Sequence, residues 1–315
     1  MTTRSETGGE SAAVIIKAFA ANLGIAIAKF AAAAMTGSSA MLTEGVHSLV
    51  DTTNQVLLFY GQRQSRRPAD ALHPAGYARE QYFWTFVVAE LVFTLGAGIA
   101  VMEGIDHLQH PSETQSPLIA LAVLAIAFLL EAWSLKAALQ AFRLQNQGTP
   151  FFQAIKRSTD TTTLSVLLED SAAVIGLSIA AAGILLELTT GNPMWDAAAS
   201  IAIGIALGLV AVLLLAKSKH LLIGQTADPA IACHVRELVR GSEHKGRIVD
   251  VLSIQDGVDR VICVVTIDFE DGLAVQEVER LCTRLETIVR KELPVVSRFY
   301  ISPYYPSPAL TQAGN

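Results

Sequence analysis

The side chains best placed to do chemistry are ionisable residues that lie inside long apolar runs. His47 and Asp51 are four residues apart and are expected on the same face of one helix. An imidazole beside a carboxylate forms half of a site for a first-row transition metal. Asp170 lies in a later apolar run, at a depth within about one helical turn of that of Asp51. The sequence therefore predicts a metal site with ligands from two helices.

The fourth position of this site stays open. Glu169 precedes Asp170 and points about 100° away from it around the helix. Water, Glu169 or a hydroxyl group would complete a tetrahedron. Glu169 is also a candidate to support a ligand by a hydrogen bond or to carry protons. The structural alternative is an interhelical hydrogen-bond network without metal.

Three further ionisable residues lie within apolar runs. Lys29 either extends toward the membrane surface or pairs with an internal carboxylate such as Glu44. Glu44 precedes His47 by three residues, and a role in pairing or in the access path is expected. Glu90 is one turn from Thr94 and is a candidate for a polar interior surface. A charge at the bilayer centre costs about 2.5–3.5 kcal/mol on insertion scales, so each of these residues is a functional candidate.

The composition indicates which elements carry these residues. Of 315 residues, 17% are charged and 51% are hydrophobic, whereas soluble globular proteins carry about 25% charge. About 13% of the first 220 residues are charged, against about 24% of the rest. A helix needs about 20 mostly apolar residues to cross a bilayer. Residues 12–220 therefore predict a mainly α membrane domain of six helices, at roughly 12–34, 40–62, 82–106, 117–141, 164–188 and 195–217.

The distribution of positive charge predicts the orientation. The connections at 35–39, 107–116 and 189–194 contain no Lys or Arg, whereas the other connections do. By the positive-inside rule both termini are cytoplasmic. Lys17 interrupts the first apolar run, which favours a retained helix over a signal peptide. Glycines such as Gly104 and Gly204 are expected to let helices approach closely.

The polar tail, residues 221–306, predicts a small α+β domain with the ferredoxin-like order α-β-β-α-β. Asp228-Pro229 starts a helix, and Asp256-Gly257 is a hairpin signal between two alternating segments. Residues 1–11 and 307–315 are expected to be disordered. The elements are a helix at 229–240, strands at 247–255 and 260–269, a helix at 273–292 and a strand at 295–301.

Several function classes are excluded. The net charge is −6 without a long Lys/Arg run, so nucleic acid is not an expected partner. The three cysteines, all in the tail, predict neither a disulfide framework nor a zinc knuckle, and they are expected to be reduced thiols. No H-E-x-x-H motif is present, and no Ser or Cys in the spans is evidently paired with a base, so an enzyme is not expected.

The motifs resemble one family over nearly the whole chain. The run from Asn22 to Asp51, ending in His47-Ser48-Leu49-Val50-Asp51, resembles the first two helices of the cation diffusion facilitators. His73 to Glu80 resembles the family's loop into the third helix, and Glu103 to Pro111 the end of that helix. The form Leu-Leu-Glu-Asp-Ser-Ala at 167–172 resembles a divergent branch, the zinc transporter 9-like members.

The resemblance implies a homodimeric, integral membrane antiporter that moves a divalent transition metal, usually zinc, out of the cytoplasm in exchange for protons. His47, Asp51 and Asp170 would then bind metal and protons in competition. No permanent cofactor is implied, since Zn²⁺ is the transported ion, and the expected partners are metal ions, protons, lipid and a second copy bound through the tail. The expected location is a bacterial inner membrane.

The chain departs from the family pattern at several positions. Val166 stands where most members have a metal ligand on the fifth helix. Asp70 and His73 match two ligands of a second metal site, but Tyr77 replaces the third, so that site is expected to be empty. Gly224 follows the sixth helix where relatives carry an acidic residue, and the tail lacks a His-rich end, so it is expected to be a metal-free dimerisation module. A non-transporting structural or regulatory homologue is the alternative function.

Overall fold

The computed structural model describes residues 22–112, 114–242 and 245–304, so the predicted disordered ends lie outside the described residues. The chain divides into two compact units. The first unit contains residues up to Arg66 together with Glu80–Lys219. The second unit contains Arg67–Arg79 together with the chain from His220 onward. The loop at 67–79 thus belongs to the same unit as the tail.

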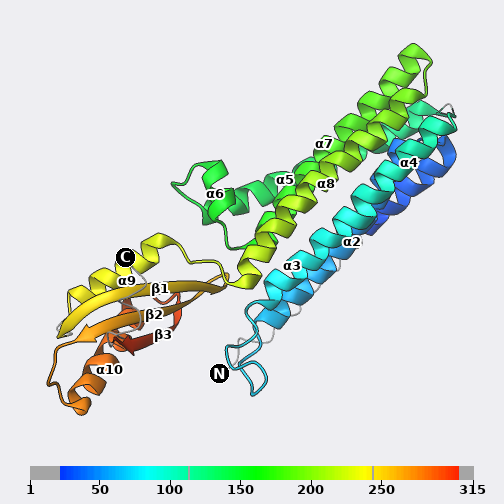
Figure 1. The fold of residues 1–315 in the computed structure, drawn as a ribbon. Coiled ribbons are helices and arrows are strands. Elements are labelled where there is room, and N and C mark those ends of the chain that lie inside the picture. The colour runs from blue at the N-terminus through cyan, green and yellow to red at the C-terminus, as the bar shows by residue number, and fades with distance from the viewer. Residues whose placement is uncertain (1–21, 113, 243–244, 305–315) are drawn as a thin grey trace, which may run out of the picture. The chain divides into compact units, whose positions relative to one another are not determined.

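The first unit is a bundle of long helices (Figure 1). Helix α2 packs against α3, α4 and α7, and α5 packs along α7. The described helices of this unit are a helix at Asn22–Thr36, α2 (Ser39–Ser65), α3 (Glu80–Leu91), the π-helix η1 (Val92–Ala97), α4 (Gly98–Gln109), α5 (Pro117–Gln145), α6 (Phe151–Arg157), α7 (Thr161–Thr190) and α8 (Met194–Ile223).

Four described helical segments are long and apolar enough to cross a membrane: Glu80–Gln109, Pro117–Gln145, Thr161–Thr190 and Met194–Ile223. These correspond to the last four of the six predicted spans. The first predicted span lies partly outside the described residues. Helix α2 has 27 residues but does not reach the same hydropathy, since it carries many polar side chains. The count of six spans therefore stays a prediction.

Two local features of the helical unit were not predicted. The connection between the fourth and fifth predicted spans contains the short helix α6. The third span is continuous from Glu80 to Gln109, but its middle turn is the π-helix η1. Hydropathy does not reveal the π-helix, because a change from i→i+4 to i→i+5 bonding leaves the apolar composition unchanged. Helix α6 has only seven residues, too few for a span.

Glycines allow α4 and α8 to approach closely, as expected. A Cβ atom on Gly104 would lie 2.9 Å from the carbonyl oxygen of Ala197, and one on Gly204 would lie 3.1 Å from that of Ala97. Neither position has room for a larger residue unless a backbone moves. These two crossings fix the distance between the third span and α8.

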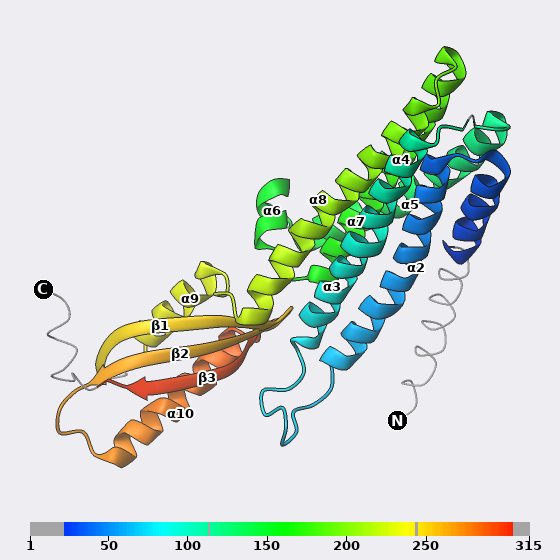
Figure 2. The ribbon, with the colours of Figure 1, turned by 45° about the vertical axis from the view of Figure 1, so that its right-hand side comes forward.

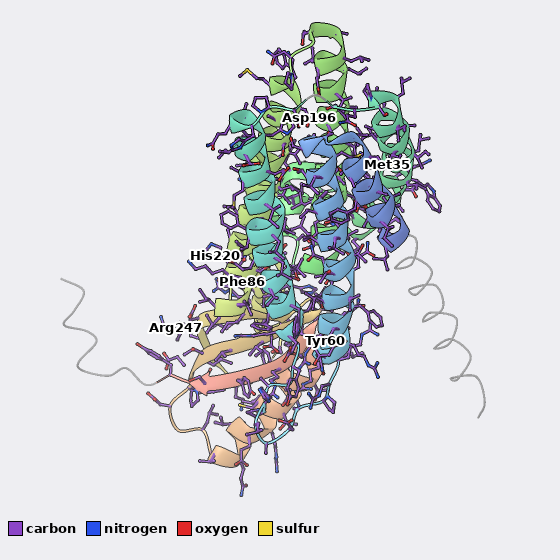
Figure 3. The ribbon with its side chains drawn as sticks, turned by 90° about the vertical axis from the view of Figure 1, so that its right-hand side faces the viewer. Met35, Tyr60, Phe86, Asp196, His220 and Arg247 are labelled. Carbon is purple, nitrogen blue, oxygen red and sulfur yellow. The ribbon has the colours of Figure 1, made fainter. Side chains whose placement is uncertain are left out.

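Asp196 of α8 holds the start of α2. Its carboxylate accepts hydrogen bonds from the Ser38 hydroxyl at 2.6 Å, the Ser39 amide at 2.6 Å and the Ala40 amide at 3.3 Å. Asp196 is fully buried and lies at the opposite end of the bundle from Tyr60 of α2 (Figure 3). A carboxylate at a helix N-terminus satisfies free amides and interacts favourably with the helix dipole. Asp196 therefore fixes α2, which carries His47 and Asp51.

The second unit has the predicted order α-β-β-α-β, and Figure 2 shows its three strands with α9 and α10. Strands β1 and β2 are antiparallel, β2 and β3 are parallel, and the sheet order is β1-β2-β3. Apolar residues of α9 and α10 pack on the β2 face that carries Val261, Cys263 and Val265. Burial raises the pKa of the Cys263 thiol to about 11. The elements are α9 (Pro229–Arg240), β1 (Gly246–Gly257), β2 (Arg260–Phe269), α10 (Val275–Glu292) and β3 (Val296–Pro303).

The predicted hairpin is confirmed, but its turn lies two residues later than the Asp256-Gly257 signal. The strands continue through Asp256 and Gly257, Gly257 pairs with Arg260, and the turn lies at 258–259. The Asp256 side chain is 4% exposed and accepts a hydrogen bond from Arg79 Nε at 3.3 Å. Asp256 therefore binds the loop at 67–79 through a long-range contact that a local turn signal does not contain.

The same loop makes further contacts with the sheet of its unit. Arg260 donates a hydrogen bond to the Ala75 carbonyl oxygen at 3.2 Å, and Arg298 donates to that of Pro74. A Cβ atom on Gly257 would lie only 2.7 Å from Cβ of Ala78. The loop is thus packed against the β1–β2 hairpin.

Replacement of Asp196 by alanine is expected to destabilise the bundle. The change leaves buried donors at the start of α2 unsatisfied, at a cost of about 1–3 kcal/mol, which corresponds to a melting temperature several degrees lower. The measurement is thermal unfolding of the purified protein in detergent. Asn192→Ala is the control, because Asn192 is an exposed residue near Asp196 in sequence that accepts a hydrogen bond only at the start of α8, from the Met194 amide. Equal melting of Asp196→Ala and the wild type would contradict this role.

Gly257→Val is expected to detach the loop at 67–79 from the hairpin, because the new side chain occupies the place of Ala78. Hydrogen–deuterium exchange should rise in peptides that cover 70–79 and stay unchanged in peptides from α7. Asp259→Ala, at an exposed position in the same turn, is the matched control. Unchanged exchange at 70–79 in Gly257→Val would show that the contact does not hold the loop.

Candidate metal centre

His47 and Asp51 lie together on α2, as their spacing predicts. His47 Nε2 is 3.3 Å from Asp51 Oδ2, and the His47 side chain is 1% exposed. Among the described residues, neither ring nitrogen of His47 has a hydrogen-bond partner, and Asp51 Oδ1 has none either. A buried imidazole without hydrogen bonds is uncommon in folded proteins and calls for an explanation such as an ion or water. Both side chains retain free ligand atoms.

Asp170 of α7 lies on the wall of a small cavity that Asp51 also lines. The cavity has a volume of about 40 Å³, comparable with the space of a single water molecule in the liquid, about 30 Å³. Ser134 of α5 donates a hydrogen bond to Asp170 Oδ2 at 2.7 Å. The structure thus brings Asp51 and Asp170 to one space, with His47 beside Asp51.

Glu169 lies on another side of α7. It is 5% exposed, and its Oε1 has no hydrogen-bond partner among the described residues. The side chain of Asn54, which is fully buried on α2, also has no hydrogen-bond partner among the described residues. Glu169 is close enough to Asp51 for their charges to interact, but it is not among the residues that line the cavity.

Lys29 pairs with Glu44, which is one of the two arrangements expected for it. Its ammonium group lies 3.0 Å from Glu44 Oε2 and 2.7 Å from Ser48 Oγ. Both members of the ion pair are fully buried. A Cβ atom on Gly176 of α7 would lie 2.5 Å from Glu44 Oε1, so the pair sits directly against that glycine.

The remaining ionisable candidate, Glu90, has an exposed side chain. Its Oε1 accepts a hydrogen bond from Thr94 at 3.2 Å, one turn along the same helix. Within this single chain Glu90 therefore does not line a polar interior, and we assign it no part in the site.

Sequence reasoning missed Glu131. It lines the same cavity as Asp51 and Asp170, from the middle of α5. A charged residue at the centre of an apolar span is a functional candidate by the rule already applied to the other spans. That signal was present in the sequence, whereas Ser134, Asn54 and Gln55 gave none that distinguishes them from ordinary polar residues.

The candidate ligands do not yet form a coordination shell. Within the described residues, no three His, Cys, Asp or Glu side chains lie close enough together to hold a metal ion. The side chains are brought to one region by α2, α5 and α7, and metal binding requires them to converge further.

The loop at 67–79 holds the residues of the second predicted metal site. Asp70 Oδ2 accepts a hydrogen bond from Tyr77 at 2.6 Å, and Oδ1 accepts from the His73 amide at 2.7 Å. The hydrogen bond from Tyr77, followed by that from the His73 amide, lowers the pKa of Asp70 below its usual value. The His73 and Tyr77 rings stack with centroids 4.3 Å apart. Both Asp70 oxygens are engaged within the loop, which favours a structural role over metal ligation.

Comparison with known proteins identifies the family. Residues 15–223 match the cation efflux transmembrane domain. The chain belongs to the cation efflux family. With four helices long and apolar enough to cross a membrane, this cation efflux protein is an integral membrane protein.

Curated relatives of this cation efflux protein are named as metal transporters. Metal tolerance protein C4 of Arabidopsis thaliana is 35% identical over 243 residues, which cover 76% of this chain and 53% of the relative. The human mitochondrial proton-coupled zinc antiporter SLC30A9 is 33% identical over 244 residues, 77% of this chain and 43% of the relative. The magnetosome protein MamM of Magnetospirillum gryphiswaldense is 31% identical over 81 residues, 26% of this chain and 25% of the relative. The chain thus spans about half the length of the first two relatives.

The resemblance to zinc transporter 9-like members is therefore confirmed, and so is membership of the cation efflux family. The comparisons name no residue of the metal site. The roles of His47, Asp51, Asp170 and Glu169 consequently stay predictions.

Lys29→Met in this cation efflux protein is expected to destabilise the bundle by about 3–5 kcal/mol, because it leaves the buried Glu44 carboxylate without a cation. Lys29→Met combined with Glu44→Gln should recover most of that loss, since no unpaired charge remains. Thermal unfolding of the two single variants and the double variant forms a double-mutant cycle. Additive losses in the double variant would show that the two side chains do not form an energetic pair.

Proposed function

We propose that this protein transports a divalent transition metal ion across a membrane, with zinc the preferred cargo, in exchange for protons. The observation that carries the proposal is that Asp51 and Asp170, from two different helices, line one small cavity, and that the buried His47 lies beside Asp51 with neither ring nitrogen hydrogen-bonded among the described residues. Membership of the cation efflux family and the names of the relatives support the same activity. These relatives are named as transporters or metal tolerance proteins, which is consistent with a protein that is not an enzyme.

The residue types support both the cargo and the exchange. A His nitrogen with carboxylate oxygens suits a borderline metal such as Zn²⁺ better than Ca²⁺ or Mg²⁺. The same groups must lose their protons to bind metal, so protons and metal compete for one site. Exposure of that site to the two sides of the membrane in turn would couple the two flows.

The assembly belongs to the same proposal. The apolar runs favour six spans, and the positive charge of the connections favours cytoplasmic termini. The second unit would join two copies of the chain. We place the protein in a bacterial inner membrane.

Val166 motivates a second candidate, a homologue that no longer transports and acts as a structural or regulatory partner. The position is apolar in this chain where most members of the family have a metal ligand. The two candidates differ in metal binding by the purified protein. Tight stoichiometric zinc binding that His47→Ala abolishes would count against the second candidate.

Asp51→Ala and Asp170→Ala are each expected to reduce metal flux at least about ten-fold, since loss even of a group that supports a metal ligand typically costs 10–100-fold. The assay uses proteoliposomes that contain a metal-sensitive dye, with zinc outside and an imposed pH gradient. A panel of Zn²⁺, Mn²⁺, Co²⁺, Fe²⁺ and Cd²⁺ identifies the cargo. An acidic lumen should accelerate metal entry if protons are exchanged.

Glu90→Gln is the matched control, because Glu90 is also an acidic residue in a span but lies outside the cavity. It should transport like the wild type. Unchanged flux in both aspartate variants would refute the site, and flux insensitive to the pH gradient would refute proton exchange.

A further inference from the structure

Glu131 of α5 is an acidic side chain in the cavity wall for which the proposed function has no role. It lines the cavity with Asp51 of α2 and Asp170 of α7, so three carboxylates from three helices face one space. Among the described residues Glu131 makes no hydrogen bond or ion pair. It is half-buried, within a helix whose sequence is otherwise apolar around it.

Three ionised carboxylates around a cavity of about 40 Å³ repel one another, so either protons or another cation must neutralise part of their charge. No Lys or Arg lines the cavity among the described residues. The charge of Lys29 acts on Asp51 and Glu131, but its ammonium group is already held by Glu44 and Ser48. The space is therefore suited to a cation that enters from outside the chain.

His47 supplies an independent indication of a cation. It is 1% exposed, neither ring nitrogen is hydrogen-bonded within the described residues, and Nε2 faces the Asp51 carboxylate at 3.3 Å. An imidazole that is buried beside a carboxylate and lacks other partners offers a nitrogen ligand to the same region. A nitrogen donor thus lies beside the cavity that the three carboxylates line, although His47 is not part of the cavity wall and would have to move toward it on metal binding.

Helix α7 corresponds to the fifth predicted span. It has valine at position 166, where the family resemblance implies a metal ligand. Glu131 lies on α5, which packs along α7. Glu169 is the other acidic candidate, but it is not among the residues that line the cavity, whereas Glu131 is. We propose that Glu131 replaces the missing ligand at Val166, so that the metal is held by His47, Asp51, Asp170 and Glu131 from three helices.

This inference rests on the proposed function and makes it more specific. One imidazole and three carboxylates form an oxygen-rich donor set. Such ligands are chemically harder than a pair of imidazoles and favour less polarisable metal ions. Such a set accepts Mn²⁺, Fe²⁺ and Co²⁺ as well as Zn²⁺. Glu131 would therefore widen the range of metals, in addition to completing the site.

The test measures metal binding by the purified full-length chain, with Zn²⁺ for affinity and Co²⁺ as a spectroscopic probe of coordination. Glu131→Gln removes the charge at nearly constant shape, and Glu131→Asp keeps the charge on a shorter side chain. Glu131→Gln is expected to weaken Zn²⁺ binding at least about ten-fold and to change the visible absorption of bound Co²⁺. Glu131→Asp should also change the Co²⁺ spectrum, since the carboxylate no longer reaches the metal in the same geometry.

Asp51→Asn and Glu90→Gln are measured alongside. Asp51→Asn should abolish binding, and Glu90→Gln should leave affinity and spectrum unchanged. If Asp51→Asn retains tight binding, the proposed site itself fails. If Asp51→Asn loses binding but both Glu131 variants keep the wild-type Co²⁺ spectrum, the site stands and Glu131 is not a ligand. The latter result overturns the inference even if Glu131→Gln weakens binding, because that loss would then reflect charge at a distance.

Discussion

An ionised side chain inside an apolar helix bundle is costly unless another group compensates its charge, and this constraint sorts the buried polar residues of the protein into two classes. Lys29 and Glu44 satisfy each other, and Asp196 is satisfied by the start of α2. Glu187 of α7 accepts two hydrogen bonds from Thr114. His47 and Asp51 retain ligand atoms without partners in the described part of the chain. The first class fixes the helices, and the second class is available for a ligand.

Much of the fold follows from the sequence because its signals are local. Asp228-Pro229 places the start of α9, and the predicted bounds of α9 and α10 agree with the structure to within two residues, since caps and prolines act on their immediate neighbours. The long helices follow from apolar runs. The turn at 258–259 did not follow, because Asp256 contacts Arg79, 177 residues earlier in the chain. A turn signal read from four residues contains no information about such a partner.

The candidate site likewise has one part that local sequence signals predict and another part that depends on contacts between distant segments. The spacing of His47 and Asp51 within one helix predicts that they meet, and they do. Which side chain of α5 faces them depends on the rotation of α5 against α7, and the uniformly apolar sequence of α5 carries almost no periodic signal for that rotation. Asp196 was missed for a similar reason: it lies at the end of a span, where a charge is unremarkable, and its partners lie on a helix distant in sequence.

The close fit of Gly176 against Glu44 bears on how this family member can vary. Any side chain at 176 would meet the carboxylate, which is itself bound to Lys29, so none of the three positions is free to change by itself. A larger residue at 176 requires the Glu44 carboxylate to move or Glu44 to be shortened, and either change disturbs the partner of Lys29. Positions 29, 44 and 176 should therefore covary among homologues as a single unit, although they lie on three different helices.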